Sequence, residues 1–161
     1  MTIVNENSAP AGPLQLRLGE IESSVGREIG PGPWLTVDQE RIDTFAEATG
    51  DHQWIHVDRE RAASGPFGRT IAHGYLTLSL LPILLADVFD VSERSSGVNY
   101  GMDQVRFVSP VPEGSRIRLS GRIASAQPKA GGVQYRLDLT IELEGSEKPA
   151  AVGQFLALAF P

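Results

Sequence analysis

The chain has 161 residues, a length that suits one domain with a hydrophobic core. Its formal net charge of −6 and the lack of a Lys/Arg cluster in the sequence argue against a nucleic-acid partner. The sequence contains no cysteine, which excludes disulfides, thiol nucleophiles and thiolate metal sites. Cysteine usage therefore gives no indication of the redox compartment.

The first residues have neither the basic start nor the long apolar run of a signal peptide. The longest apolar run, Tyr75–Phe89, contains polar residues and a proline and is too short to span a bilayer. We therefore expect a cytoplasmic protein with no membrane partner. Residues 1–13 are polar and rich in Pro, Ala and Gly, so we predict a flexible N-terminal segment before one domain at 14–161.

The first third of the chain leads into one amphipathic helix. Leu14–Val25 shows no decisive period, and a short helix and an irregular lead-in both fit it. The Gly-Pro-Gly-Pro run Gly30–Pro33 is a clear break. Thr36–Gln39 has the spacing of a capping box, in which the Gln39 side chain reaches back to the cap. Apolar residues then recur at helical spacing, so we predict a helix that stops at Gly50.

Residues 45–58 are the stretch around which we expect the chain to be organised. Asp51 follows the glycine that ends the helix, and His56 comes five positions later on an irregular turn that can fold back. A carboxylate and an imidazole that converge on one point can move protons to and from a single water molecule. We interpret the pair as the working centre of a small enzyme. From spacing alone, a capping or loop role for Asp51 is the more frequent outcome.

The middle of the chain predicts a buried helix. Asp58 is placed to cap a short helical turn before a loop at residues 64–68. Tyr75–Phe89 is apolar nearly all round, so a helix there must be covered on most sides. Pro82 removes one internal hydrogen bond and bends this helix unless it lies near a local break. Gly74 at the helix start leaves exposed backbone N–H groups, a natural place for developing negative charge.

Beyond the polar loop that follows, the apolar pattern changes to period two, which is typical of strands. Apolar residues precede and follow a turn at Pro110–Gly114. Residues 133–143 alternate without a miss between hairpin turns at 129–132 and 144–146. A last strand carries Val152, Leu156, Leu158 and Phe160. We therefore predict an α+β fold in which a curved antiparallel sheet wraps round the Tyr75–Phe89 helix.

Four separated blocks of sequence resemble the MaoC-like dehydratases, which are (R)-specific enoyl-CoA hydratases and include a nodulation-protein-N-like branch. The blocks are residues 45–58, 71–75, 100–107 and 110–114. They occur in the right order, and the resemblance covers residues 34–125. It implies a hot-dog fold and reversible hydration of trans-2-enoyl thioesters to (R)-3-hydroxyacyl thioesters. It also implies acyl-CoA as substrate, no cofactor, and a homodimer that joins two sheets edge to edge.

Carried over residue by residue, the resemblance assigns Asp51 and His56 as the catalytic pair and the Gly74 N–H as the donor to the thioester oxygen. Six further residues are expected to contact the substrate: Gln53, Trp54, His73, Tyr75, Asn99 and Tyr100. The sequence does not assign acid and base, because histidine has a reference pKa near ~6.5 and can act as either. His73 is explained more simply by loop hydrogen bonding, and His52 by exposure. The histidine spacings match no familiar metal site, so we expect no metal.

The chain departs from the family pattern in two places, which together involve three residues. Many members have Asn and Pro where this chain has Gln53 and Trp54, and some have a serine at the position of Pro82. These changes leave the proton-transfer pair intact but bear on the range of substrates. Two other functions stay open. Thioester hydrolysis needs an acid or nucleophile on the central helix, where the sequence offers only Asp87. A non-catalytic acyl-thioester-binding or partner subunit has no reason to keep both catalytic residues.

Overall fold

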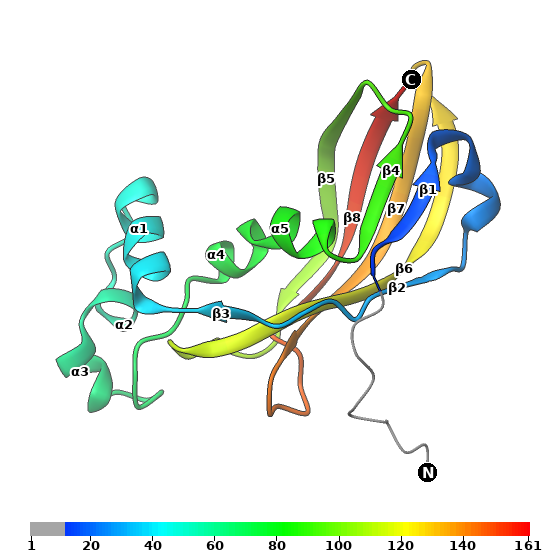
Figure 1. Cartoon of the computed structure of the whole chain (residues 1–161). Coiled ribbons are helices and arrows are strands. Elements are labelled where there is room, and N and C mark those ends of the chain that lie inside the picture. Colours follow the sequence, from blue (N-terminus) through cyan, green and yellow to red (C-terminus); the bar gives the residue numbers. More distant parts are fainter. Residues whose placement is uncertain (1–11) are drawn as a thin grey trace, which may run out of the picture.

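The computed structural model describes residues 12–161 (Figure 1). The flexible segment predicted for residues 1–13 therefore falls, up to residue 11, outside the described part of the chain. Within residues 12–161 the chain forms eight strands, five α-helices and two short 3-10 helices. None of these helices is long and apolar enough to cross a membrane.

An antiparallel sheet of six strands forms the body of the molecule (Figure 1). Five strands follow one another in the order β2 (Glu28–Ile29), β6 (Ser115–Lys129), β7 (Gly132–Leu143), β8 (Ala151–Phe160) and β5 (Ser96–Phe107). The short β3 (Leu35–Val37) pairs with another part of β6. A separate parallel pair joins β1 (Leu14–Arg17) to β4 (Phe89–Ser92). The predicted α+β fold with a curved antiparallel sheet is confirmed.

The hairpin predicted at residues 129–132 joins β6 to β7. Its two loop residues, Ala130 and Gly131, have φ angles of 51° and 82°. A two-residue loop with positive φ at both positions matches the twist of the strands that it connects. The resulting register places Leu119 opposite Ile141, so that apolar residues of both strands share one face.

Three helices lie together at one end of the sheet (Figure 1). They are α1 (Gln39–Thr49), α2 (Trp54–Val57) and α3 (Arg59–Ala63). As predicted, α1 stops at Gly50, which has a φ of 77°, and Asp58 caps α3 by accepting a hydrogen bond from the Arg61 N–H. The predicted capping box at the start of α1 is wrong. Asp38 caps α1 instead, because Thr36 pairs with β6 as part of β3.

The helix predicted at Tyr75–Phe89 is two consecutive helices, α4 (Gly74–Ser79) and α5 (Leu81–Ala86), which lie against the sheet (Figure 1). Leu80 joins them, and Pro82 lies in the first turn of α5. A proline is tolerated there because the first N–H groups of a helix have no internal acceptor. The prediction of one long helix is wrong in this respect, and its last residue, Phe89, begins β4 instead.

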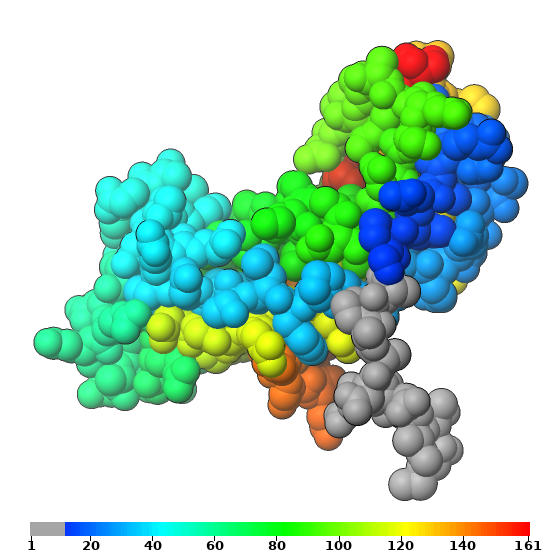
Figure 2. Space-filling view, viewed as in Figure 1, coloured from blue at the N-terminus to red at the C-terminus, as the bar shows by residue number. Residues whose placement is uncertain are grey.

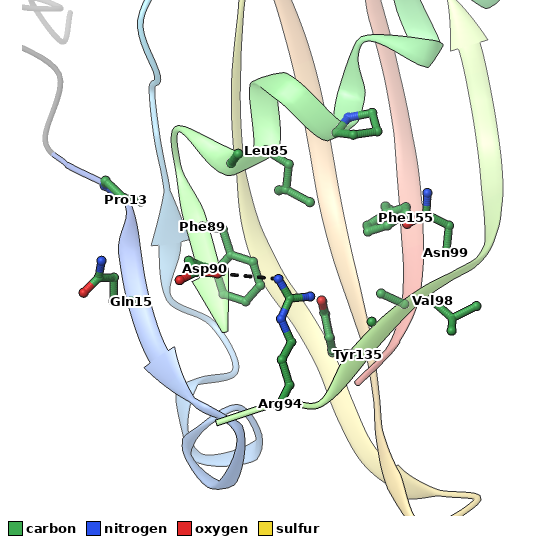
Figure 3. A pocket seen from close by; sticks show the side chains of 14 residues that line it. Pro13, Gln15, Leu85, Phe89, Asp90, Arg94, Val98, Asn99, Tyr135 and Phe155 are labelled. Atoms are coloured by element: carbon green, nitrogen blue, oxygen red, sulfur yellow. Dashed lines mark ion pairs between the residues drawn. The ribbon is translucent and has the colours of Figure 1, made fainter. Parts of the chain in front are cut away.

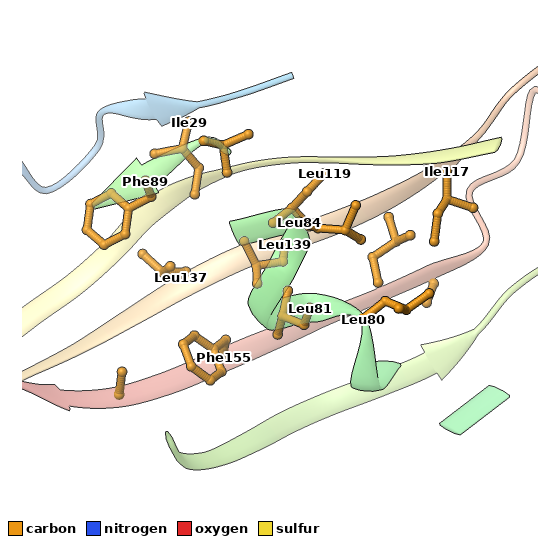
Figure 4. Packing of buried hydrophobic residues seen from close by; sticks show 14 of the residues in the cluster. Ile29, Leu80, Leu81, Leu84, Phe89, Ile117, Leu119, Leu137, Leu139 and Phe155 are labelled. Carbon is orange, nitrogen blue, oxygen red and sulfur yellow. The ribbon is translucent and has the colours of Figure 1, made fainter. Parts of the chain in front are cut away.

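The hydrophobic core lies between α4–α5 and the inner face of the sheet. Leu80, Leu81 and Leu84 of the helical segment pack over buried residues of β6, β7 and β8 (Figure 4). The sheet residues labelled there are Ile117, Leu119, Leu137, Leu139 and Phe155. On β8 the residues that join the core cluster are Phe155 and three alanines. The apolar residues that the sequence analysis assigned to this strand lie at the alternate positions: Val152, Leu156, Leu158 and Phe160. The short alanines leave room for the helices.

Removal of a buried side chain from this core tests the packing. Leu137 is 0% exposed at the centre of β7, so Leu137→Ala leaves a cavity and is expected to lower the free energy of unfolding by about 2–5 kcal/mol. Urea denaturation followed by circular dichroism measures the change. The control is Val25→Ala, because Val25 is 46% exposed and should lose less than about 0.5 kcal/mol. Equal losses in both variants would contradict the assigned core.

Candidate active site

Three side chains from separate segments converge beside the start of α4. They are Asp51, which follows α1, His56 in α2, and His73, which precedes α4. One oxygen or nitrogen atom of each lies within 4.8 Å of the corresponding atoms of the other two. Asp51 is exposed, whereas His56 and His73 are only 6% and 3% exposed. The predicted convergence of Asp51 and His56 is therefore present in the structure.

His56 is fixed in one orientation by a backbone acceptor. Its Nδ1 lies 2.7 Å from the carbonyl oxygen of Ile71. Because a carbonyl oxygen only accepts, Nδ1 carries the proton and Nε2 keeps the lone pair. Burial lowers the pKa of His56, and the neighbouring His73 lowers it further, against the opposing effects of the Ile71 carbonyl and Asp51. The imidazole is consequently neutral near pH 7 and able to accept a proton at Nε2.

His73 connects the two members of the predicted pair. Its Nε2 donates a hydrogen bond to the backbone carbonyl of Asp51 at 2.9 Å. Its ring stacks on the ring of His56 with centroids 3.8 Å apart and planes inclined by 24°. The ring of Phe45, in α1, also packs against the ring of His73, with the two centroids 5.0 Å apart. Within residues 12–161 the buried Nδ1 of His73 has no hydrogen-bond partner.

Gly74 begins α4 directly beside these groups. The ring of Phe107, at the end of β5, lies so close that a Cβ at position 74 would approach it to 2.9 Å. A larger residue at position 74 would have to displace this ring, so glycine suits the packing here. The Gly74 N–H is among the first four of α4, which have no acceptor within the helix. Tyr75 is 70% exposed and packs edge-on against Phe107, with ring centroids 5.9 Å apart.

A buried polar network holds α2 in place, and the sequence pattern did not reveal it. The Gln39 side chain, 8% exposed, donates to the backbone carbonyl of His56 at 2.8 Å and accepts from the Thr70 hydroxyl. The Ile71 N–H donates to the carbonyl of Ile55 at 3.0 Å. One signal was available, because Gln39 lies at i−3 from the buried Ile42 and is therefore a polar residue on the apolar face of α1.

The remaining predicted contact residues take different positions. Gln53 is exposed, and its N–H donates to the Asp51 carboxylate at 3.3 Å. Trp54 is partly buried under the Arg61 guanidinium, 4.2 Å from the ring centroid, and so packs against α3. His52 is exposed, as expected, and its hydrogen bond to Glu47 raises its pKa.

Asn99 and Tyr100 line a cavity of about 420 Å³ between the helices and β5. The cavity begins at Leu78, one helical turn beyond Gly74, and continues to Leu85. We call it the acyl groove for the occupant that we propose for it; it is defined by Leu78, Ser79, Leu81, Pro82, Leu85, Asn99, Tyr100, Gly101, Met102 and Phe155. Its apolar lining contrasts with the polar cluster at Asp51 and suits a hydrocarbon chain.

The same three side chains of the cluster, Asp51, His56 and His73, could also hold a metal ion. Each imidazole has one nitrogen bonded to a backbone carbonyl. This orients the ring and leaves its second nitrogen for either a metal ion or a proton, so the arrangement fits proton transfer as well as it fits metal binding. The expectations of no metal, no cofactor and a cytoplasmic location stay predictions.

Comparison with known proteins gives consistent results. A family model described as "MaoC like domain" matches residues 20–141. The chain is 46% identical over 138 residues to 3-hydroxyacyl-thioester dehydratase Z of Mycobacterium tuberculosis, covering 85% of this chain and 91% of the relative. It is 44% identical over 149 residues to nodulation protein N of Rhizobium leguminosarum bv. viciae, covering 89% and 91%.

Among solved structures, the R-hydratase PhaJ1 of Pseudomonas aeruginosa matches with a TM-score of 0.70. The identity is 23%, and the match covers 84% of this chain and 81% of that one. At this identity the likeness shows the fold, and it confirms the hot-dog architecture.

The environment of His56 predicts how stability depends on pH. The folded state favours the neutral imidazole, whereas the unfolded imidazole binds a proton near pH ~6.5. Below that pH the unfolded state binds more protons, so the free energy of unfolding is expected to fall as pH decreases from about 7 to 5. Urea denaturation at each pH measures this fall, and His56→Gln should reduce it. An NMR titration that places the pKa of His56 above its ordinary value would contradict the prediction.

Proposed function

This chain belongs to the family of MaoC-like dehydratases, and we propose that it adds water reversibly to trans-2-enoyl-CoA to give (R)-3-hydroxyacyl-CoA. The observation that carries the proposal is the convergence of the Asp51 carboxylate with the His56 imidazole beside the first residue of α4. A relative named for the dehydration of 3-hydroxyacyl thioesters supports the same reaction class.

In the hydration direction, one water molecule lies between Asp51 and His56, next to C3 of the substrate. One member of the pair accepts a proton as the water oxygen bonds to C3. The π electrons of the C2=C3 double bond form a bond between C1 and C2, and those of the carbonyl group move to the thioester oxygen, where the Gly74 N–H stabilises the enolate. A proton from the pair then bonds to C2, the thioester carbonyl reforms, and the pair returns to its starting protonation state.

The neutral His56 fits the role of proton acceptor in this scheme. Its Nε2 keeps a lone pair because Nδ1 is bound to the Ile71 carbonyl, and burial lowers its pKa below the ordinary value. Asp51 is exposed and bonded through one oxygen to the Gln53 N–H. It is therefore free to orient the water through its other oxygen.

The acyl groove gives the hydrocarbon part of the substrate a place to bind. Phe107 at the end of β5 contacts Gly74, so the groove between β5 and the two helices starts at the catalytic end. With the thioester at Gly74, the chain is directed along α4 and α5 towards Leu85. The rise of eleven helical residues, about 16 Å, provides length for a medium or long chain.

We also propose that the protein is a homodimer joined along β5. Among the described strands, β5 pairs only with β8, so its other edge is unpaired. The 12 residues of β5 are mostly exposed. An unpaired edge of this length is a template for another strand. Exposed apolar side chains accompany it on β5 and the adjacent helices: Tyr75, Ile83, Val98, Tyr100 and Phe107. A second copy of the sheet, added edge to edge, would cover them.

Thioester hydrolysis has less support. The acid that the sequence offered for it, Asp87, follows the last residue of α5 at the opposite end of the helical segment from Gly74. A purely binding or partner subunit would not need the neutral, oriented imidazole at His56. Both alternatives can be separated from hydration in a single set of assays.

Loss of either member of the pair tests the proposed reaction. Asp51→Asn and His56→Ala are each expected to reduce the hydration of crotonyl-CoA by about 10²–10⁴-fold, because a positioned acid or base contributes a factor of that size. The loss of enoyl-thioester absorbance measures the rate, and release of free CoA is measured in parallel.

His52→Ala is the matched control, because His52 adjoins Asp51 but is exposed and paired with Glu47. Circular dichroism checks that each variant is folded. Near-normal hydration by Asp51→Asn or His56→Ala would refute the assignment. Free CoA release without hydration by the wild-type protein would favour the thioesterase.

The dimer is tested on the edge strand itself. Val98→Lys combined with Tyr100→Lys places charges on the proposed contact, so the double variant is expected to elute as a monomer while the wild-type protein has twice the mass. Light scattering after gel filtration measures both masses. Val25→Lys, on an exposed residue away from β5, is the control. A monomeric wild-type protein at micromolar concentration would contradict the dimer.

A further inference from the structure

A second cavity lies beyond the acyl groove. Its volume is about 440 Å³, and it is bounded by α5, β1, β4 and β5, with β7 and β8 as its floor (Figure 3). In the space-filling view a hollow between α5 and β5 shows β8 beneath (Figure 2). Four residues line both cavities: Pro82, Leu85, Asn99 and Phe155. We call this second space the distal cavity.

The two cavities form one path along the helices. The acyl groove starts one turn after Gly74, and the shared Leu85 lies near the end of α5. On the opposite wall, β5 runs from Phe107 at the catalytic end to Gly97 and Val98 in the distal cavity. A chain that follows this path from the thioester site reaches the distal cavity with its far end.

The far end of this path is polar. Three side chains that can form hydrogen bonds, Asp90, Arg94 and Tyr135, lie together there among apolar residues (Figure 3). Tyr135 is 5% exposed and packs edge-on against Phe89, with ring centroids 5.7 Å apart. Burial raises the pKa of Tyr135, so its hydroxyl stays protonated and can donate.

Arg94 and Asp90 provide a donor and an acceptor side by side. Their closest charged atoms are 3.6 Å apart, which is longer than a strong charge-assisted hydrogen bond. The guanidinium lies against the backbone of Gly97, where even a Cβ would overlap it. This part of the cavity has no net charge, so it suits a neutral group that both donates and accepts hydrogen bonds. A carboxylate would meet the Arg94 guanidinium but would be repelled by Asp90.

We propose that the distal cavity binds the hydroxylated end of a long acyl chain, and that the enzyme prefers enoyl thioesters with a terminal hydroxyl group over plain ones of the same length. The chain hydroxyl accepts from Tyr135 or Arg94 and donates to Asp90, while the preceding methylene groups contact Leu85 and Phe155. This inference rests on the proposed hydratase function and names its substrate class.

The test compares two substrates of equal length, trans-2-hexadecenoyl-CoA and 16-hydroxy-trans-2-hexadecenoyl-CoA, whose chains are long enough to pass Leu85. The wild-type protein is expected to show a kcat/KM about three- to tenfold higher for the hydroxylated substrate, the worth of one net hydrogen bond. In Tyr135→Phe this preference should largely disappear, because the variant keeps the ring packing and loses only the hydroxyl. Arg94→Leu should reduce the same preference.

Crotonyl-CoA is the internal control, because its short chain ends before the distal cavity. The rate of each variant with the two long substrates is divided by its own rate with crotonyl-CoA, so that a general loss of activity does not count as a change in preference. If the wild-type protein hydrates crotonyl-CoA but shows no preference for the hydroxylated chain, the distal-cavity inference is wrong and the hydratase function stands. If neither crotonyl-CoA nor either long substrate is hydrated, the proposed function itself fails. A stronger preference for the chain with a terminal carboxylate, or an unchanged preference in Tyr135→Phe, would also overturn the inference.

Discussion

The candidate active site depends on hydrogen bonds that tie one turn of helix, α2, to the segment just before α4. His56 donates from Nδ1 to the carbonyl of Ile71, and the Ile71 N–H returns a bond to the carbonyl of Ile55. Gln39 and Thr70 complete the link from the side of α1. An isolated four-residue helix has no stability of its own. These buried bonds therefore decide where the imidazole points, and each would leave an unsatisfied polar group if broken.

His73 extends the same link to Asp51. Through its bond to the Asp51 backbone carbonyl and its stack on His56, it holds the backbone of Asp51 beside the imidazole. The residue that follows it is Gly74, the first residue of α4. The stacked histidine pair and the start of the helix thus form one unit, so the proposed proton-transfer groups and the proposed oxyanion donor keep a fixed relation. Preorganisation of this kind is what a water-addition reaction requires.

The broken helical segment has consequences for the substrate. Because Leu80 and Pro82 divide it into α4 and α5, the segment follows the curved sheet while its leucines stay in the core. The side facing β5 leaves the acyl groove and the distal cavity open. Pro82 lines both spaces, which connects its departure from the family pattern to the range of acyl chains that we propose the protein binds.

The sequence by itself determined the local elements and singled out Asp51 and His56, two side chains that the folded chain brings together. Gly50 ends α1, Asp58 caps α3, and the alternation at 133–143 is β7, because these signals depend on neighbouring residues alone. The predicted capping box was wrong because Thr36 pairs in the sheet with Arg116, a residue distant in the sequence. Likewise, the roles of Gln39 and the stack of His73 on His56 depend on segments that meet only after folding. The tertiary structure alone decided the orientation of the imidazole and the polar end of the distal cavity, since both arise from contacts between residues far apart in the chain.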